Sequence, residues 1–167
     1  MSSLEPPDSF HLSAATGWLE LGNHVEAGQE LAGISAACHE HPDVLEVRWA
    51  ICAAGNDWEG GLSAAELLLK KAPKRSSGWL HRAYALRRVK RGGLQQAWEA
   101  LRPAFEKFPK EPVIPYNLAC YACQKGLLAE AREWLQRAVK IAGRENIRSM
   151  ALNDEDLQQL WEEIKGM

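Results

Sequence analysis

The stretch YNLACYACQKGLLAEAREWLQRA, residues 116–138, decides the fold. In its second half, Ala131, Leu135 and Ala138 are three and four residues apart, so their side chains share one face of a helix. Gly126 separates this helix from the residues before it, at a position where helices commonly end in left-handed backbone geometry. The stretch therefore predicts two helices joined by a tight turn.

The same pattern returns earlier in the chain. After Gly92, residues 94–104 repeat the order Ala, three residues, Leu, two residues, Ala. Looser copies follow two earlier glycines, as Gly22 with Ala27, Leu31 and Ile34, and as Gly55 with Gly60, Ala64 and Leu67. The four glycines are 33, 37 and 34 residues apart, and Pro42, Pro73, Pro109 and Gly143 follow the four units in turn. A period near 34 residues indicates an array of stacked helical pairs.

These residues resemble the tetratricopeptide repeat (TPR) family over residues 9–142, most closely in the unit that contains Gly126. The resemblance implies an all-α fold, an α-solenoid of four TPR-like helix-turn-helix repeats with units of about 9–41, 42–73, 74–109 and 110–142. A flexible N-terminus, 1–8, is expected before them and a capping segment, 143–167, after them.

Apolar spacing and helix-breaking residues predict helices near 9–21, 24–40, 43–54, 57–71, 76–91, 94–107, 113–125 and 127–141. Pro103 lies inside one of them and should kink it. A last helix is expected over 153–165, where Asn153 and acidic residues precede an apolar face. This helix either caps the final repeat or lies in the groove of the solenoid, and the exposed end of a solenoid favours capping.

Composition limits the class of protein. The longest uncharged run, residues 112–124, contains two prolines and is too short to span a bilayer, and the start of the chain has no secretory pattern. A cytoplasmic protein that does not enter membranes is expected.

Charge is unevenly distributed along the chain. Residues 1–72 hold 3 Lys/Arg and 11 Asp/Glu, whereas residues 73–110 hold 10 Lys/Arg and 2 Asp/Glu. This asymmetry can steer a charged partner or reflect complementary surfaces of neighbouring helices.

The TPR resemblance also implies where a partner binds. Family members generally hold a peptide or protein segment on the concave surface formed by the first helix of each pair. By register, that groove would be lined by Leu12, Thr16, Trp49, Trp79, Arg82, Leu86, Tyr116 and Cys120. Large aromatic side chains dominate many interfaces, although some of these residues could instead pack between repeats.

A basic patch is expected at Arg87, Arg88, Lys90 and Arg91, near the end of a predicted helix where cations suit the helix dipole. Solvated charge is the common explanation for such a run, and an acidic peptide or phosphate is the functional alternative. A nucleic-acid partner is not expected, because only one helix is basic and the sequence pI is about 6.2.

No enzyme motif is visible, and no cofactor is expected. Cys120 and Cys123 fall in the middle of a predicted helix, so they are interpreted as small buried side chains. His39, Glu40 and His41 are the nearest approach to a metal site, but residues two apart point to different faces of a helix. The sequence thus predicts a non-enzymatic protein-interaction adaptor. The alternatives are self-association between the acidic N-terminal repeats and the basic third repeat, giving a homo-oligomer, and a thiol-dependent redox protein.

Overall fold

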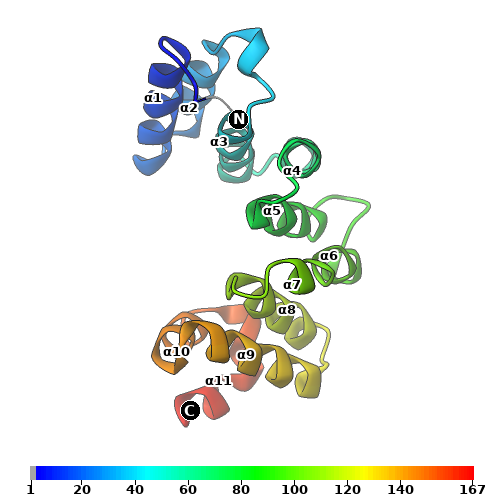
Figure 1. Cartoon of the computed structure of the whole chain (residues 1–167). Coiled ribbons are helices and arrows are strands. Elements are labelled where there is room, and N and C mark those ends of the chain that lie inside the picture. Colours follow the sequence, from blue (N-terminus) through cyan, green and yellow to red (C-terminus); the bar gives the residue numbers. More distant parts are fainter. Residues whose placement is uncertain (1–2) are drawn as a thin grey trace. The chain divides into compact units, whose positions relative to one another are not determined.

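The structure is a computed structural model that describes residues 3–167, and every regular element in that range is a helix (Figure 1). Two compact units divide the chain: unit 1 ends at Val89 and unit 2 is Lys90–Met167. The all-α prediction is therefore confirmed. The predicted flexible N-terminus begins outside the described residues; within its described part, Leu4 packs against the core of unit 1.

The described part of unit 1 contains five helices and one short 3₁₀ segment. They are α1 (Asp8–Glu20), α2 (His24–Ala32), η1 (Ala36–Cys38), α3 (Pro42–Ala54), α4 (Trp58–Lys71) and α5 (Ser76–Leu86). Each helix packs on the next, and α1 with α3 and α3 with α5 also touch, which is the arrangement of stacked helical pairs. Ala15, Ala27, Leu31, Ile34 and Val44 form the first core, so small residues let α1, α2 and α3 approach closely.

Three helical pairs share one turn geometry. Each turn has three residues, and its central residue takes a positive φ: 76° at Gly22, 58° at Asn56 and 75° at Gly126. In each turn the third residue donates its backbone N–H five residues back, as Asn23 to Trp18, Asp57 to Cys52 and Leu127 to Ala122, at 2.8, 2.8 and 2.9 Å. This is the Schellman end of a helix, which glycine and asparagine tolerate best.

The second repeat is one residue out of the predicted register. Asn56, and not Gly55, takes the left-handed position. Consequently Gly61, and not Gly60, occupies the buried place that Ala27 and Ala131 hold in the other pairs. The predicted frame of Gly55, Gly60, Ala64 and Leu67 was therefore wrong at its turn, because a search for glycine misses an asparagine in the same role.

Two helices are shorter than predicted. The helix expected over 24–40 ends at Ala32, and Ser35 is held by Asp8, whose carboxylate oxygens accept the Ser35 backbone N–H at 2.8 Å and hydroxyl at 2.6 Å. A Cβ on Gly33 would lie 2.7 Å from the ring of His11, so a larger residue there would require this ring to move. The helix expected over 76–91 ends at Leu86.

The third predicted repeat, 74–109, is divided between the units. Its first helix, α5, belongs to unit 1, whereas α6 (Leu94–Leu101) and α7 (Ala104–Lys107) belong to unit 2. Residues 87–93 connect α5 to α6, a longer connection than the three-residue turns of the other pairs. The helix expected over 94–107 is interrupted at Arg102 and Pro103, as the predicted kink requires, because proline cannot donate the helical hydrogen bond.

Unit 2 is built around α8 (Val113–Gln124), which pairs with α9 (Leu128–Ala142). Nine of the twelve residues of α8 are buried, since α6, α7, α9 and the C-terminal segment all pack on it. A helix covered on all sides is apolar all round, which explains the uncharged run over 112–124.

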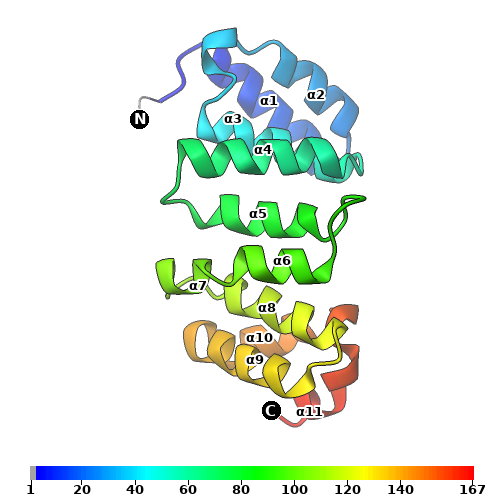
Figure 2. The ribbon, with the colours of Figure 1, turned by 90° about the vertical axis from the view of Figure 1, so that its right-hand side faces the viewer.

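The C-terminal segment contains α10 (Arg144–Ala151), the 3₁₀ helix η2 (Glu155–Leu160) and α11 (Trp161–Lys165) (Figure 2). The single helix predicted over 153–165 is thus two short ones, and α10 was not predicted, because only Ile147 and Ala151 face inward. Gly143, with a φ of 87°, ends α9 and starts α10. Within residues 3–167, no helix has both the length and the apolar character needed to cross a membrane.

Candidate protein-interaction surfaces

The first helices of the pairs in unit 1 are α1, α3 and α5, and they form one face that we call the inner face. It carries Asp43 and Glu46 from α3 and Ser77 and His81 from α5, which are linked by hydrogen bonds. His81 Nε2 lies 2.7 Å from Glu46 Oε2, and the Ser77 hydroxyl donates to Glu46 Oε1. Arg75 Nη1 lies 2.6 Å from Asp43 Oδ1 and 3.8 Å from Glu46 Oε1. The network fixes α5 against α3 and makes this face polar.

Glu46 is the most enclosed carboxylate of this network. Desolvation acts to raise its pKa, but the hydrogen bonds from His81 and Ser77 outweigh it, so the pKa of Glu46 lies below its ordinary value. Glu46 is therefore an ionised acceptor at neutral pH. The network was not predicted, and the register set by Asn56 is the sequence signal that would have placed Glu46 on this face.

A hollow of about 330 Å³ lies beside α1 on the inner face. It is lined by Leu4, Ser9, Leu12, Ser13, Thr16, Gly17, Glu20 and Asp43. Leu12 and Thr16, two of the predicted groove residues, are thus together at an open surface, and the Thr16 hydroxyl donates to the backbone oxygen of Leu12 at 2.9 Å. The hollow combines an apolar patch, three hydroxyls and two carboxylates.

Trp49 is half-buried and packs against neighbouring helices instead of lining an open groove. Its ring stacks on His81 at 3.8 Å between centroids and meets Tyr84 edge-on at 5.8 Å. Its other neighbour is Gly61 of α4, where a Cβ would lie 3.7 Å from the indole. Trp49 therefore packs between α3, α4 and α5, because the predicted register of this repeat was shifted.

The predicted groove residues of α5 are half-buried. Arg82 turns toward α4, with its Nε 3.9 Å from Glu66 Oε1. Trp79 and Leu86 lie on a different side of α5 from Ser77 and His81, as helical spacing requires.

The predicted basic patch is not a uniform surface. The Arg88 guanidinium lies over the Tyr84 ring at 3.6 Å and over the Trp58 ring at 5.0 Å, so its charge is committed to cation–π contacts. Arg87 is half-buried in unit 1, whereas Lys90 and Arg91 are exposed in unit 2.

Tyr116 and Cys120, the predicted groove residues of the fourth repeat, are covered by the C-terminal segment. Tyr116 is 4% exposed and donates its hydroxyl to Asp154 Oδ2 at 2.9 Å, and Cys120 Sγ lies 3.5 Å from the same oxygen. Gln124 and Gln159 form further bonds across this contact, to the backbone oxygens of Asp156 and Cys123. The prediction that Tyr116 and Cys120 line an open groove is therefore wrong for unit 2.

The cysteines are arranged as packing residues. All four are free thiols, and Cys120 and Cys123 are buried. Burial is the main cause of a raised pKa at both Cys52 and Cys123, which disfavours the reactive thiolate. Cys120, Asp154 and Asp156 bring three potential metal-ligand atoms within 4.8 Å of one another, but Asp154 already accepts from Tyr116 and from the Asp156 backbone N–H.

The residues around His39 also have separate structural partners. His39 Nε2 lies 2.8 Å from the backbone oxygen of Ile34, and His41 Nδ1 accepts the Asp43 backbone N–H at the start of α3. Glu40 pairs with Lys71 of α4. These contacts support the interpretation of this trio as a polar helix connection.

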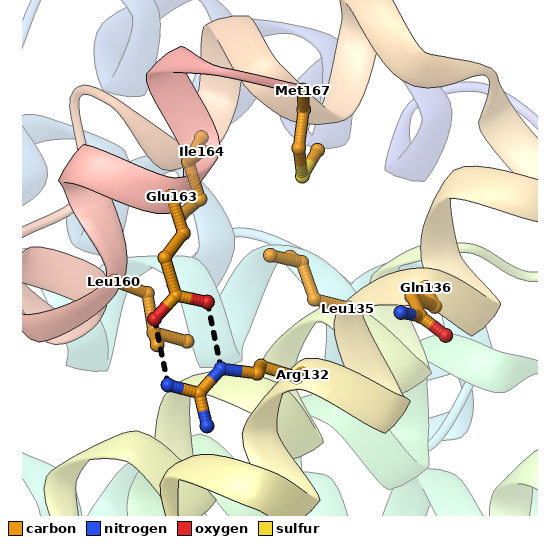
Figure 3. Close-up of a pocket in the computed structure, with 7 residues that line it drawn as sticks. All are labelled: Arg132, Leu135, Gln136, Leu160, Glu163, Ile164 and Met167. Atoms are coloured by element: carbon orange, nitrogen blue, oxygen red, sulfur yellow. Dashed lines mark hydrogen bonds and ion pairs between the residues drawn. The ribbon is translucent and has the colours of Figure 1, made fainter.

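A small pocket of about 200 Å³ lies where the C-terminal segment meets α9 (Figure 3). Leu135, Leu160, Ile164 and Met167 supply its apolar wall, and Arg132 closes one side by donating two hydrogen bonds, 2.6 and 2.7 Å, to the Glu163 carboxylate. Pockets for drug-sized ligands usually measure roughly 300–1,000 Å³. The pocket is better described as part of the contact between the C-terminal segment and α9.

Comparison with known proteins supports the fold. No protein-family model matches the sequence, and no curated protein matches it. Among solved structures, the chain is similar to the one described as "MamA RS-1 ArsTM double mutant", with 16% sequence identity and a TM-score of 0.68 over 96% of this chain and 92% of that one. MamA is a TPR-containing protein. The chain therefore has a TPR-like helical-repeat fold.

Proposed function

We propose that this chain is a non-enzymatic protein-interaction module that binds a peptide or protein segment on the inner face of unit 1. The hollow beside α1 is the observation that carries the proposal, since it is open and combines Leu12 with hydroxyl and carboxylate groups. Apolar patches with a few placed polar groups are typical of binding sites. Proteins built from stacked helical repeats expose extended surfaces, and they use these surfaces to bind partners.

The chemistry of the hollow favours a partner segment with an apolar and a basic side chain. Glu20 is exposed and forms no ion pair with another residue of the described chain. Asp43 Oδ1 pairs with Arg75 at 2.6 Å and its Oδ2 lies 3.7 Å from His41 Nδ1, but the side chain is half exposed and can accept a further donor. A Lys or Arg of the partner can lie between these carboxylates while an apolar side chain packs on Leu12.

Thr16 and Ser63 provide a matched pair for the test. Both are exposed helical residues whose hydroxyl donates to the backbone oxygen four residues earlier, at 2.9 and 3.0 Å. Only Thr16 lines the hollow. Thr16→Arg places a bulky cation in the hollow, where it competes with a basic residue of the partner for the two carboxylates, whereas Ser63→Arg places the same side chain on α4. In affinity capture from the native host, a partner retained by wild type and Ser63→Arg but lost by Thr16→Arg supports the proposal. If all three proteins retain the partner equally, the partner binds at a site other than the hollow.

Self-association is the second candidate function, favoured by the charge asymmetry of the chain. Residues 1–72 have a large acidic excess and residues 73–110 a large basic excess. This candidate predicts oligomers that dissociate as salt is raised and that Arg87→Glu with Arg88→Glu abolishes. Sedimentation at low and high salt decides it: a monomer at both salt concentrations contradicts self-association.

A further inference from the structure

Helix α1 has a second apolar face besides the one that enters the core. We call it the α1 end stripe, and it consists of Phe10, Ala14, Gly17, Trp18 and the C-cap residue Leu21, whose spacing of three and four places them on one side of the helix. Phe10 is 67% exposed, Trp18 36% and Leu21 77%. Large apolar side chains gathered on one exposed stripe mark an interaction surface more strongly than scattered ones.

The opposite side of α1 fills the core of unit 1. Ala15 is fully buried, and Leu12 and Leu19 pack against the same cluster as Val44 of α3. The α1 end stripe is therefore turned away from α3, at the position where a preceding repeat would stack. In unit 2, α10, η2 and α11 pack on α8 and α9 (Figure 2). Nothing among residues 3–167 covers the stripe on α1 in this way.

No contact or backbone angle in the described chain requires glycine at position 17. Gly17 lies inside α1 with a negative φ, and a Cβ built on it would have no atom within 4 Å. Glycine within a helix is less stable than alanine, because it loses more backbone freedom on folding. Together with Ala14, it leaves a shallow place between Phe10 and Leu21 where the backbone of another helix can approach closely.

The part of the chain that carries the stripe is acidic. Residues 1–47 contain eight Asp/Glu and no Lys or Arg, although Glu40, Asp43 and Glu46 are paired with Lys71, Arg75 and His81. Asp8 is hydrogen-bonded to Ser35 and Glu30 to His11, but Glu20 and Glu26 at the C-terminal end of the stripe have no ion-pair partner within the described chain. A second copy of the same helix would bring like charges together, whereas a basic partner would neutralise them.

We infer that the α1 end stripe docks an amphipathic helix of another protein, one whose apolar face is flanked by Lys or Arg. The helix lies along the three turns of α1, its apolar side chains cover Phe10, Trp18 and Leu21, and its cations meet Glu20 and Glu26. The stripe differs from the hollow on the inner face, although Gly17 lies in both and Glu20 also lines the hollow. Phe10, Trp18 and Leu21 lie outside the hollow, so variants at these residues test the stripe separately from the proposed function.

The test uses two synthetic helical peptides with the same leucine pattern, one with lysine and one with glutamate on the flanks. Their binding to the full chain is measured by fluorescence anisotropy. The lysine peptide is expected to bind at least tenfold more tightly than the glutamate peptide. The double change Phe10→Ser, Leu21→Ser should weaken it at least tenfold. Leu127→Ser with Met150→Ser, which changes two exposed apolar residues of unit 2, should not.

Gly17→Leu is the second variant, because it blocks close approach without removing an apolar side chain. It should weaken binding of the lysine peptide while circular dichroism shows unchanged helicity. Three results would overturn the inference: equal binding of the two peptides, unchanged binding by both stripe variants, or a wild-type dimer in sedimentation that the stripe variants convert to monomer. The last result would assign the stripe to a second copy of the chain.

Discussion

Asp154 joins the C-terminal segment to α8, and its replacement by alanine is the most informative perturbation of unit 2. Its carboxylate accepts hydrogen bonds from Tyr116 at 2.9 Å and from the backbone N–H of Asp156 at 3.0 Å, and it lies 3.5 Å from Cys120 Sγ. Burial, together with the neighbouring Cys120 and Asp154, raises the pKa of Tyr116 well above its usual range, so the hydroxyl remains a donor at neutral pH.

The expected cost follows from these contacts. Losing the cap of η2 costs about 1 kcal/mol. Leaving the buried Tyr116 hydroxyl without its charged acceptor costs about 1–3 kcal/mol. Asp154→Ala should therefore reduce the unfolding free energy of unit 2 by about 3 kcal/mol. Denaturant unfolding followed by circular dichroism measures this loss, and mass spectrometry after brief alkylation shows whether Cys120 and Cys123 become accessible.

Glu155→Ala is the matched control, since Glu155 is exposed in the first turn of η2 and forms no side-chain contact with another described residue. It should change stability by less than about 0.5 kcal/mol and leave both thiols protected. The reasoning is refuted if Asp154→Ala is as stable as Glu155→Ala and its thiols react no faster than those of wild type.

Three further outcomes are expected. Asn56→Ala should destabilise unit 1 by about 1–2 kcal/mol, whereas Asn56→Gly should be neutral or stabilising in thermal unfolding, because the φ of 58° suits glycine; equal loss in both variants would contradict the assignment of Asn56 to the left-handed turn position. Because the pKa of Glu46 is lower in the folded chain, its ionised form contributes stability above its ordinary pKa of 4.5 that is lost as pH falls through the folded value. Wild type should thus lose more stability than Glu46→Gln in denaturant unfolding between pH 7 and pH 3, and parallel profiles would exclude this role. Cys52 and Cys123 should alkylate slowly at pH 7.5 until denaturant is added, and fast labelling of native protein would favour a thiol-dependent activity.

The fold could be predicted because its signals are local. Ala131, Leu135 and Ala138 repeat the helical spacing, Gly126 marks the turn, and Pro103 interrupts a helix where its missing N–H requires it. The uncharged run over 112–124 also had a physical meaning, since α8 is enclosed on all sides.

The candidate site was predicted less well because it depends on register. Reading Gly55 as the turn, when Asn56 takes that role, shifted the second repeat, so Glu46 was missed and Trp49 was expected in an open groove instead of against His81. Tyr116 and Cys120 have the correct register, but their cover comes from residues 154–159, and no local pattern indicates such a distant contact.

Binding at the inner face of unit 1 is the main conclusion about function, and the Thr16→Arg and Ser63→Arg pair is its sharpest test. The measurement is quantitative mass spectrometry of proteins captured from the native host by wild type and by each variant. Binding in the hollow predicts at least one protein that wild type and Ser63→Arg retain equally and that Thr16→Arg loses at least tenfold. Identical retention by all three proteins, or no retained protein at all, would contradict it.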